Sequence, residues 1–341
     1  MSRYTSSFTI GNLLLDNNIF YAPLAGCSDY PFRRMAISSL SSVRPGLFFC
    51  EMVKMDALIR REPTTHRLLD YDASMHPIGA QLCGSNIDYV ADSCHMIEDL
   101  GFDWIDLNCG CPVDKITKDG SGSALLRNPE KIGDILHKMV SSTSLPVSLK
   151  IRAGWDDESI NAREIAVIAE EAGASLITIH GRTRQQAYKG KAAFSPIREA
   201  KQAVRSLPVF ANGDVFDPIS AKNLFDQTGA DGILVARGTM GQPWIVEDIA
   251  HFYATGKVNS RSILEIKEYF LAHFQEIVQY QPDKKALLDM RRVGSWFLRT
   301  IPGSKELRDS VLSEKNPEAV LQMLREFDWQ SFEESSPLTV G

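Results

Sequence analysis

The stretch PVSLKIRAGWDDESINAREIAVIAEEAGASLITIH, residues 146–180, decides the fold. It begins with the apolar run PVSLKI and ends with LITIH, and both runs are rich in the β-branched residues that strands prefer. Between them, residues 161–174 repeat apolar side chains at helical spacing, and Gly173 ends that pattern as a helix C-cap does. Strand, helix and strand in this order predict a βαβ unit with two parallel strands.

The same unit recurs on both sides of this stretch. Six more short apolar runs have the composition of buried strands: IFYAPLA at 19–25, LFFCEMV at 47–53, PIGAQL at 77–82, FDWIDLN at 102–108, PVFAN at 208–212 and DGILVA at 231–236. Eight parallel strands over about 250 residues predict a (β/α)8 TIM barrel, because open doubly wound sheets usually stop at five or six strands. Residues 1–250 should therefore form the barrel. Only helical periodicity follows, so residues 251–341 should form an appended, all-helical C-terminal domain.

Composition and charge narrow the class of protein. Of the 341 residues, 44% are hydrophobic and 23% are charged, which excludes a disordered, collagen-like or coiled-coil chain. The formal net charge is −6, whereas a chain that binds nucleic acid by bulk electrostatics is normally basic. No run reaches the roughly 18 apolar residues of a membrane span, and the first residues lack a secretory signal pattern. We therefore expect a cytoplasmic monomer with reduced cysteines that does not engage a membrane.

Polar residues after the last two runs predict a phosphate site. They are Asn212, Gly213 and Asp214 after the seventh run, and Ala236, Arg237 and Gly238 after the eighth. TIM barrels often bind phosphate with these two loops, where backbone N–H groups meet an anion and glycines let the backbone approach. Arg237 adds a fork of donors. The alternative is that the glycines only make tight turns.

Other strand ends carry groups that suit a flavin ring. Lys150 lies in line with a buried strand, so its ammonium either meets an anion or loses its proton. Reduced flavin carries negative charge near N1 and the C2 carbonyl, and a cation there favours the reduced form. Gln81 and Asn108 could exchange hydrogen bonds with the N3–C4 edge of the same ring. His180 could reach the ring or the phosphate, or could simply pack in the core.

The segment NCGCPVDKITKDGSGSALLRNPE, residues 108–130, holds two thiols. No second cysteine pair at zinc spacing follows Cys109 and Cys111, so we expect no metal site. A thiol with an ordinary pKa of about 8.5 is mostly protonated at neutral pH, so it can act as an acid as readily as a nucleophile.

Six segments together resemble the tRNA-dihydrouridine synthases, flavin enzymes that reduce a uridine in tRNA. The segments are YAPLAGCSDYPFR from residue 21, DLNCGCPVDKITKDGSGSALL from 106, LKIRAGW from 149, IHGRTRQQAYKG from 179, ANGDV from 211 and ARGTMGQPW from 236. They follow one another over residues 21–244. The resemblance implies an FMN-bearing barrel followed by a helical domain that helps to hold tRNA.

The resemblance also implies roles for individual residues. The cofactor residues would be Pro23, Leu24, Ala25, Gln81, Asn108, Lys150, His180, Asn212, Gly213, Asp214, Ala236, Arg237 and Gly238. Cys111 matches the family's catalytic cysteine. Cys109 stands where the family commonly has a methionine, which leaves open which thiol reacts. Ala236 stands where a glycine is common, a departure that matters only if that backbone needs a positive φ.

The mechanism that the resemblance implies is the reduction of the uracil C5–C6 double bond. NADPH reduces FMN, N5 of reduced FMN delivers hydride to C6, and Cys111 protonates C5. The target base must leave its stack, which costs a few kcal/mol. Arg182 and Arg184 would clamp that nucleotide, or would lie in a solvated loop.

The main alternative is an FMN-barrel reductase of a small molecule, similar to dihydroorotate dehydrogenases or old yellow enzymes. That reading explains the barrel and the phosphate site but not the helical domain. Residues 284–308 favour tRNA, because they carry seven Lys or Arg, including Arg291 and Arg292, against two acidic residues. A solvated helix face would explain the same charge. A non-enzymatic RNA-binding protein would lack the placement of Cys111 and Lys150.

Overall fold

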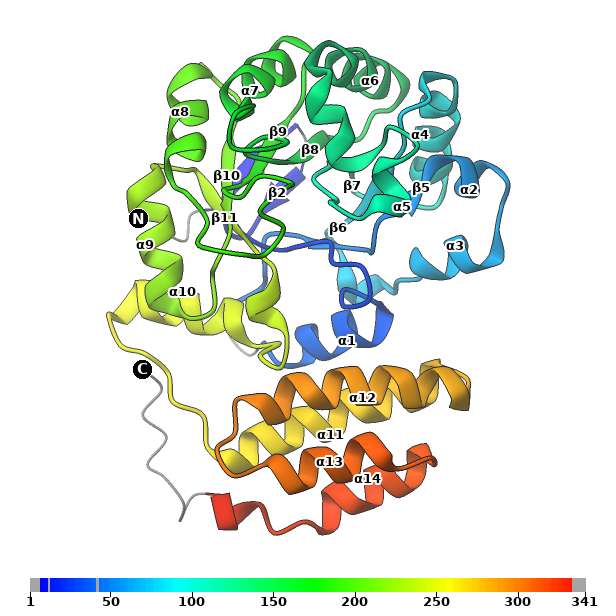
Figure 1. Cartoon of the computed structure of the whole chain (residues 1–341), viewed down its shortest axis with the longest axis vertical. Helices are drawn as coiled ribbons and strands as arrows, with labels where there is room; N and C mark the ends of the chain where they lie inside the picture. The colour runs from blue at the N-terminus through cyan, green and yellow to red at the C-terminus, as the bar shows by residue number, and fades with distance from the viewer. Residues whose placement is uncertain (1–6, 12, 41–42, 333–341) are drawn as a thin grey trace.

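A barrel of parallel strands forms the centre of the computed structural model, which describes residues 7–11, 13–40 and 43–332 (Figure 1). Its strands are β3 (Ile19–Tyr21), β4 (Phe48–Phe49), β5 (Val53–Lys54), β6 (Ile78–Cys83), β7 (Trp104–Cys109), β8 (Val147–Arg152), β9 (Leu176–His180), β10 (Val209–Asn212) and β11 (Gly232–Val235). They are hydrogen-bonded in the order β3, β11, β10, β9, β8, β7, β6, β4, and β5 also pairs with β6. The predicted (β/α)8 barrel is confirmed.

The first and last strands of the barrel close it. Leu234 of β11 pairs in parallel with Phe20 of β3, and Phe20 in turn bridges to Leu47, just before β4. Tyr21 N donates to Leu47 O at 3.0 Å across the same junction. Because the strands are parallel, closure brings all their carboxyl ends to one rim.

The run at 47–53, predicted as one strand, is interrupted. Phe49 of β4 pairs with Gly79, whereas Val53 of β5 pairs with Leu82, so three residues on one strand face two on β6. One extra residue in one of two paired strands is a β-bulge, which turns side chains away from the regular alternation. Residues 50–52 lie in this bulge.

An N-terminal hairpin that the sequence did not predict packs against the barrel interior. It consists of β1 (Phe8–Ile10) and β2 (Leu13–Leu15), which pair antiparallel. Leu15 is fully buried in a cluster with Phe20, Trp104 and Phe210, whose side chains come from three different barrel strands. The Phe20 and Phe210 rings lie 4.6 Å apart. Strands this short carry too weak a period to be recognised before the barrel exists.

Helices surround the barrel in the order that the βα pattern predicts (Figure 1). They are α1 (Tyr30–Ser38), α2 (Met55–Ile59), α3 (Pro63–Leu68), α4 (Val90–Asp99), α5 (Asp114–Thr117), α6 (Pro129–Ser142), α7 (Ala162–Glu171), α8 (Ser195–Ala203), α9 (Pro218–Thr228) and α10 (Ile245–Thr255), with the 3₁₀ turns η1 (Ala73–Met75), η2 (Ile87–Tyr89), η3 (Gly122–Arg127) and η4 (Arg237–Thr239). The predicted boundary at residue 250 falls within α10, whose buried residues Ile245, Val246 and Ile249 belong to the barrel's core.

Four helices and a terminal turn form the helical unit, a bundle with its own core. They are α11 (Ile263–Tyr280), α12 (Asp283–Arg299), α13 (Lys305–Ser313), α14 (Pro317–Glu326) and η5 (Trp329–Phe332). Phe270 stacks on Phe297 at 4.8 Å between ring centres, and Trp329 meets Phe270 edge-on. Residues 333–341, also assigned to this unit from the sequence, lie outside the described residues.

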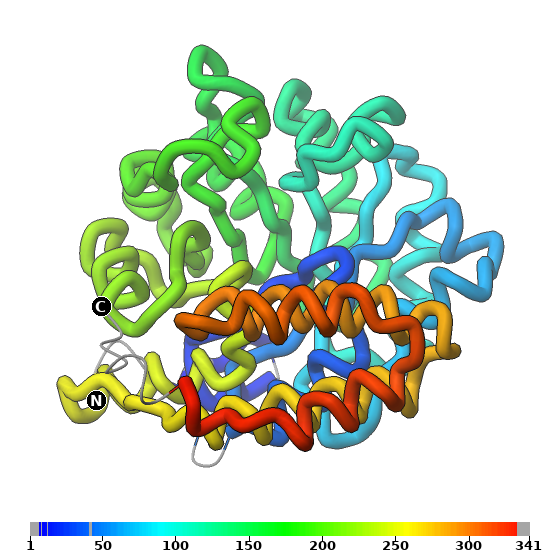
Figure 2. The backbone as a smooth tube through the Cα atoms, turned by 60° about the horizontal axis from the view of Figure 1, so that its bottom comes forward, coloured from blue at the N-terminus to red at the C-terminus, as the bar shows by residue number. Residues whose placement is uncertain are grey.

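The helical unit lies directly against the barrel. Figure 2 shows its helices crossing one side of the barrel, and α11 packs along α1. At the end of α11, Tyr280 stacks on Tyr30 at 4.8 Å and its hydroxyl donates to Asp70 Oδ2 at 2.6 Å. Arg67 donates to the Tyr280 carbonyl at 2.6 Å. Within the described ranges, no helix is long and apolar enough to cross a membrane.

The loop after β11 touches the backbone of α12 at a glycine. Gly241 has φ +75°, and a Cβ there would lie 2.8 Å from the Trp296 carbonyl group. Gly256, which ends α10 with φ +71°, has nothing within 4 Å of its Cβ position. Both glycines therefore have a φ that would strain any other residue, but only Gly241 lies against another element.

We expect Gly241→Ala to lower the free energy of unfolding by about 2 kcal/mol or more, because it adds a backbone clash to a strained φ. Gly256→Ala is the matched control and should lose only about 1 kcal/mol. Urea denaturation followed by tryptophan fluorescence measures both. Equal losses of unfolding free energy in the two variants would show that α12 moves away from residue 241 at no cost, and would contradict this prediction.

Candidate active site

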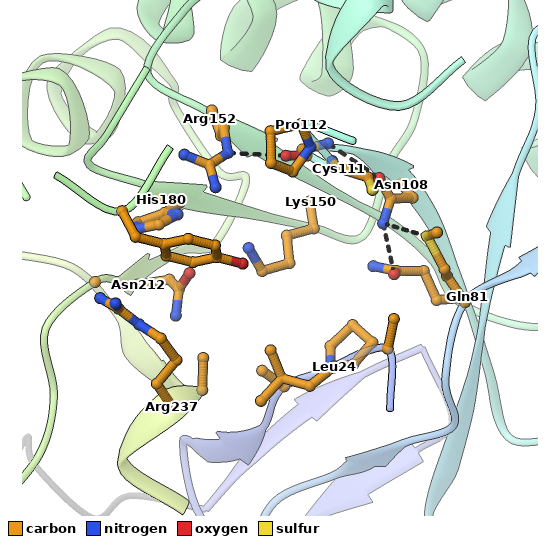
Figure 3. Close-up of a pocket in the computed structure, with 18 of the residues that line it drawn as sticks. Leu24, Gln81, Asn108, Cys111, Pro112, Lys150, Arg152, His180, Asn212 and Arg237 are labelled. Atoms are coloured by element: carbon orange, nitrogen blue, oxygen red, sulfur yellow. Dashed lines mark hydrogen bonds between the residues drawn. The ribbon is translucent and has the colours of Figure 1, made fainter. Parts of the chain in front are cut away.

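A cavity of about 390 Å³ opens at the carboxyl ends of the barrel strands (Figure 3). All the predicted cofactor and catalytic residues except Gly238 line it: Pro23, Leu24, Ala25, Gln81, Asn108, Cys111, Lys150, His180, Asn212, Gly213, Asp214, Ala236 and Arg237. The parallel register explains part of this grouping. Asn108 of β7 is level with Lys150 of β8, and His180 of β9 is level with Asn212 of β10.

A buried hydrogen-bonded chain orients the two predicted amides. Gln81 Nε2 donates to Asp106 Oδ2 and Gln81 Oε1 accepts from Asn108 Nδ2, each at 2.7 Å. Ser148 donates to the other oxygen of Asp106 and accepts from Trp104 Nε1 at 2.7 Å. Burial raises the pKa of Asp106 to about 6, although the hydrogen bonds from Gln81 and Ser148 oppose the rise. Gln81 keeps one amide hydrogen and part of its acceptor capacity for a ligand in the cavity, whereas Asn108 Nδ2 also contacts Met52 Sδ at 3.5 Å and Asn108 Oδ1 accepts from Gly110 N and Cys111 N.

Lys150 brings a partly buried positive charge to the centre of the cavity wall (Figure 3). Burial lowers its pKa to about 8, with Arg152 acting in the same direction and Asp106 opposing. Among the described residues, no acceptor lies within hydrogen-bond distance of the Lys150 ammonium. A partly buried cation without such a partner favours an anionic ligand, because ion pairing would offset the cost of its desolvation.

The structure separates the two candidate thiols. Cys111 lines the cavity, whereas Cys109 is fully buried in the barrel's core. Burial raises the pKa of the Cys111 thiol, although the Val113 N–H and the charges of Arg152 and Lys150 lower it in part. Cys111 is therefore protonated at neutral pH, as a proton donor must be.

Neighbouring groups fix the turn that carries Cys111. Asn108 Oδ1 accepts from Cys111 N at 2.9 Å, and Ser123 N and Oγ both donate to the Cys111 carbonyl. Gly122 has φ +59°, and a Cβ there would lie 2.9 Å from the same carbonyl. The glycine-rich loop after the thiol thus packs on Cys111 and holds it in place.

Two loops meet where the sequence predicts a phosphate site. The backbone N–H groups of Gly213, Asp214, Arg237 and Gly238 have no acceptor among the described residues. Gly213 has φ +132° and Asp214 φ +49°, so successive N–H groups can converge on one anion. Gly238 does not line the cavity, but a Cβ there would clash with the Val215 carbonyl. Glycine at 238 therefore lets the two loops touch.

Asp214 organises the arginines beside this site. Arg182 donates twice to Asp214, at 2.7 Å from each terminal nitrogen, and Arg237 donates at 2.9 Å. Burial alone would raise the pKa of Asp214, but Arg182, the Ala192 N–H and Arg237 together lower it. Burial and the surrounding positive charges hold the pKa of His180 well below its ordinary value, so its imidazole is neutral.

The arginines predicted to bind tRNA lie outside the cavity lining. Arg182 is only 2% exposed, and its contacts, with Asp214 and the carbonyls of residues 189 and 190, are internal. Arg184 donates to Asp114 at 2.6 Å and lies over the Trp155 ring. Arg291 and Arg292, on α12, are partly exposed.

The cavity also has lining residues that sequence reasoning missed. They are Ala22, Met52, Gly110, Pro112, Val113, Arg152, Tyr188, Val215, Phe216 and Met240. Arg152 donates to the carbonyls of Gly110, Thr183 and Ala187. Its guanidinium also faces the Tyr188 ring at 5.6 Å. Position 152 follows Lys150 by two residues on β8, and the two-residue period of a strand could have indicated it.

These groups fit a flavin nucleotide. The ammonium of Lys150 has no acceptor among the described residues, which suits the negative charge of a reduced flavin ring, and the free N–H groups suit a phosphate. Leu24 and Met240 provide apolar walls for the ring. Over the described ranges, no cluster of three or more His, Cys, Asp or Glu is arranged to hold a metal ion.

The fold and the site place the chain among the (β/α)8-barrel oxidoreductases. The dihydrouridine synthase family model matches residues 20–332. The chain therefore belongs to the dihydrouridine synthase family and is a flavin-dependent oxidoreductase.

Curated relatives support this membership over nearly the whole chain. The chain is 35% identical to the tRNA-dihydrouridine synthase B of Pseudomonas syringae pv. tomato, over 94% of each chain. It is 37% identical to a probable tRNA-dihydrouridine synthase of Rickettsia conorii, over 93% of this chain and 95% of that protein.

Solved structures share the fold at low identity. Histamine dehydrogenase from Rhizobium sp. 4-9 matches 80% of this chain with a TM-score of 0.56 and 13% identity. A 2-naphthoyl-CoA reductase matches 73% of it with a TM-score of 0.57 and 12% identity. The chain spans about half the length of each, so these likenesses concern the barrel fold alone.

We expect Lys150→Met to stabilise the cofactor-free protein at pH 7 and to weaken its hold on the cofactor. The lysine pKa falls from 10.5 to about 8 on folding, so below pH 8 its burial costs about 3 kcal/mol, at about 1.36 kcal/mol per unit. Between pH 8 and 10.5 the unfolded chain binds more protons, so the stability of the wild type rises with pH and the difference between the two proteins closes.

Urea denaturation of the cofactor-free proteins at pH 7, 8.5 and 10 measures this difference. Flavin content after purification measures the hold on the cofactor. A Lys150→Met protein that is no more stable at pH 7 and retains full flavin would contradict both roles.

Proposed function

We propose that the protein is a tRNA-dihydrouridine synthase that reduces the C5–C6 double bond of specific uridines in tRNA, with FMN as cofactor and NADPH as reductant. The observation that carries the proposal is the protonated Cys111 thiol on a fixed turn, facing the same cavity as the partly buried Lys150 ammonium. A proton donor and a flavin-binding cation around one cavity suit the reduction of a ring that must receive both hydride and proton.

The residues around the cavity divide between the two ends of the cofactor. Lys150 would balance negative charge on the ring, while Gln81 and Asn108, oriented by Asp106, would bind its polar edge. Arg237 and the free N–H groups of residues 213, 214, 237 and 238 would hold the phosphate. Reduced FMN held by these residues would supply the hydride for C6 of the uracil ring.

Cys111 would supply the proton for C5. The developing negative charge on the substrate takes a proton from the thiol, so transfer breaks S–H and forms C5–H. Asn108 holds the turn through the Cys111 N–H, and the Ser123 contacts hold the carbonyl group of the same residue. The nearby charges of Lys150 and Arg152 stabilise the thiolate that remains.

The helical unit and the barrel rim would hold the tRNA. On the rim, Tyr188 is 54% exposed, and its ring faces the guanidinium of Arg237 at 4.7 Å. Bases stack on exposed aromatic rings of this kind. Arg184, beside Trp155, remains our candidate clamp for the target nucleotide, whereas the contacts of Arg182 favour a role in orienting Asp214. NADPH as the reductant, a monomeric state and a cytoplasmic location stay predictions.

We expect Cys111→Ala to keep bound flavin but to lose dihydrouridine formation by about 10²-fold to 10⁴-fold, the range of a lost general acid. Cys109→Ala is the matched control, since Cys109 lies in the core away from the cavity. Its dihydrouridine yield should stay near that of the wild type. Liquid chromatography with mass spectrometry of tRNA nucleosides measures the product. Equal losses in both variants would remove the acid role from Cys111.

The function itself is tested by mapping dihydrouridine, position by position, in tRNA from cells with and without the gene. We expect at least one position to lose the modification and to regain it when purified enzyme, FMN and NADPH are added. If no position changes, the small-molecule reductase becomes the better assignment.

A further inference from the structure

Helix α12 of the helical unit lies behind the cofactor cavity and touches two of the loops that line it. The first is the β3 loop, residues 22–29, of which Ala22, Pro23, Leu24 and Ala25 line the cavity. The second is the β11 loop, residues 236–244, which contributes Ala236, Arg237 and Met240. Figures 1 and 2 show α12 running alongside the barrel at this point.

Arg292 carries the contact with the β3 loop. Its Nη2 lies 3.6 Å from Asp29 Oδ2, and its Nη1 lies 3.6 Å from the position that a Cβ on Gly26 would take. The same guanidinium pairs with Asp289 at 3.0 Å, and Asp289 is completely buried. Arg292 is thus held from its own helix while it faces the loop.

Asp29 divides its carboxylate between two partners. Its Oδ1 accepts from Phe32 N at 3.0 Å and so caps α1, which leaves Oδ2 for Arg292. Glu51, from the bulge, accepts from Gly26 N and lies close enough to Asp29 for their charges to repel. Burial raises the pKa of both acids, and Arg292 opposes the rise in each. Arg292 therefore offsets the negative charge of these two acids on the side of the β3 loop that faces α12.

Hydrogen bonds within the β3 loop connect its cavity-lining residues to the residues that face α12. Leu24 N donates to Ser28 Oγ at 2.9 Å, and Cys27 N and Ser28 N both donate to the Leu24 carbonyl at 2.9 Å. A shift at Asp29 or Gly26 is thereby transmitted to Leu24, which lines the cavity.

The β11 loop meets the same helix about one turn further on. Gly241 approaches the Trp296 carbonyl so closely that a side chain would not fit between them. Met240, the preceding residue, lines the cavity. Arg292 and Trp296 are four residues apart and so lie on one face of α12.

We propose that α12 sets the position of the cofactor loops, and that Arg292 is a positioning residue for the flavin site rather than a contact to tRNA. The inference rests on the proposed function in its choice of FMN and tRNA as probes. It assigns the helical unit a second task besides holding substrate, namely to support one wall of the cofactor site.

The test compares Arg292→Ala, Asp29→Asn and the double variant with the wild-type holoenzyme. Asp29→Asn keeps an oxygen to cap α1 but loses the charge that faces Arg292, so it probes the same contact with little risk to folding. Dilution of each holoenzyme releases FMN, and the fluorescence of free flavin reports its dissociation constant. We expect each single variant to raise that constant about fivefold or more, and the double variant to raise it no further.

Arg291→Ala is the matched control. Arg291 neighbours Arg292 on α12 but donates to the Glu314 carbonyl inside the helical unit. We expect it to release FMN as the wild type does, whereas Arg292→Lys, which keeps the charge, should recover part of the wild-type affinity.

The salt dependence of tRNA binding separates positioning from a phosphate contact. A lost phosphate contact reduces the slope of log Kd against log salt by about one. We expect Arg292→Ala to keep the wild-type slope. Unchanged FMN release together with a reduced slope would place Arg292 on tRNA and overturn the inference. A wild type that neither binds FMN nor makes dihydrouridine would instead overturn the proposed function.

Discussion

The Lys150 ammonium, partly buried toward the carboxyl end of β8, is the constraint around which the site is arranged. A charge in that place costs free energy unless a partner offsets the cost, and Asp106 does so only in part. Burial and the positive charges around it, that of Lys150 included, lower the pKa of His180 and keep its imidazole neutral. Asn108, which pairs with Lys150 across β7 and β8, has an uncharged amide side chain. The protein therefore presents to whatever enters the cavity a positive charge that has no hydrogen-bond acceptor among the described residues, and an anionic ligand would relieve its cost.

The sequence predicted the barrel and most of the cavity lining for one reason. Parallel strands end at a common rim, so a polar residue at the end of each apolar run reaches the same space whatever the loops do. Lys150, His180 and Asn212 were found in this way, and the fold needed no knowledge of their partners. The choice between Cys109 and Cys111 required the structure, because residues two apart on an extended segment should share a face. The turn after β7 breaks that alternation and sends only Cys111 to the cavity.

Interactions that join distant segments were not predictable. Arg182 looked like a solvent-facing clamp because its partner, Asp214, follows it by 32 residues on another loop. Arg292 counted toward a basic segment, although its guanidinium faces acids of the barrel and of its own helix. Arg291, next to it, turns toward the Glu314 carbonyl. A count of charges along the sequence therefore overstates the number available to RNA, because it cannot tell a solvated cation from one that ties two elements together.

The place where the helical unit attaches follows from how the barrel closes. β3 and β11 are neighbours in the sheet but lie at opposite ends of the barrel sequence, so no short connection fixes their loops relative to one another. Elsewhere in the barrel, consecutive strands are joined by a helix that packs on both. At this junction α12, which lies outside the barrel, takes the place of such a helix. Arg292 contacts the β3 loop, and the Trp296 backbone contacts the β11 loop. A bundle placed anywhere else on the rim could still hold RNA, but it would leave the β3 and β11 loops only their direct contacts, such as those of the Ala22 N–H with the Val235 carbonyl at 2.9 Å and of the Tyr21 hydroxyl with the Pro243 carbonyl.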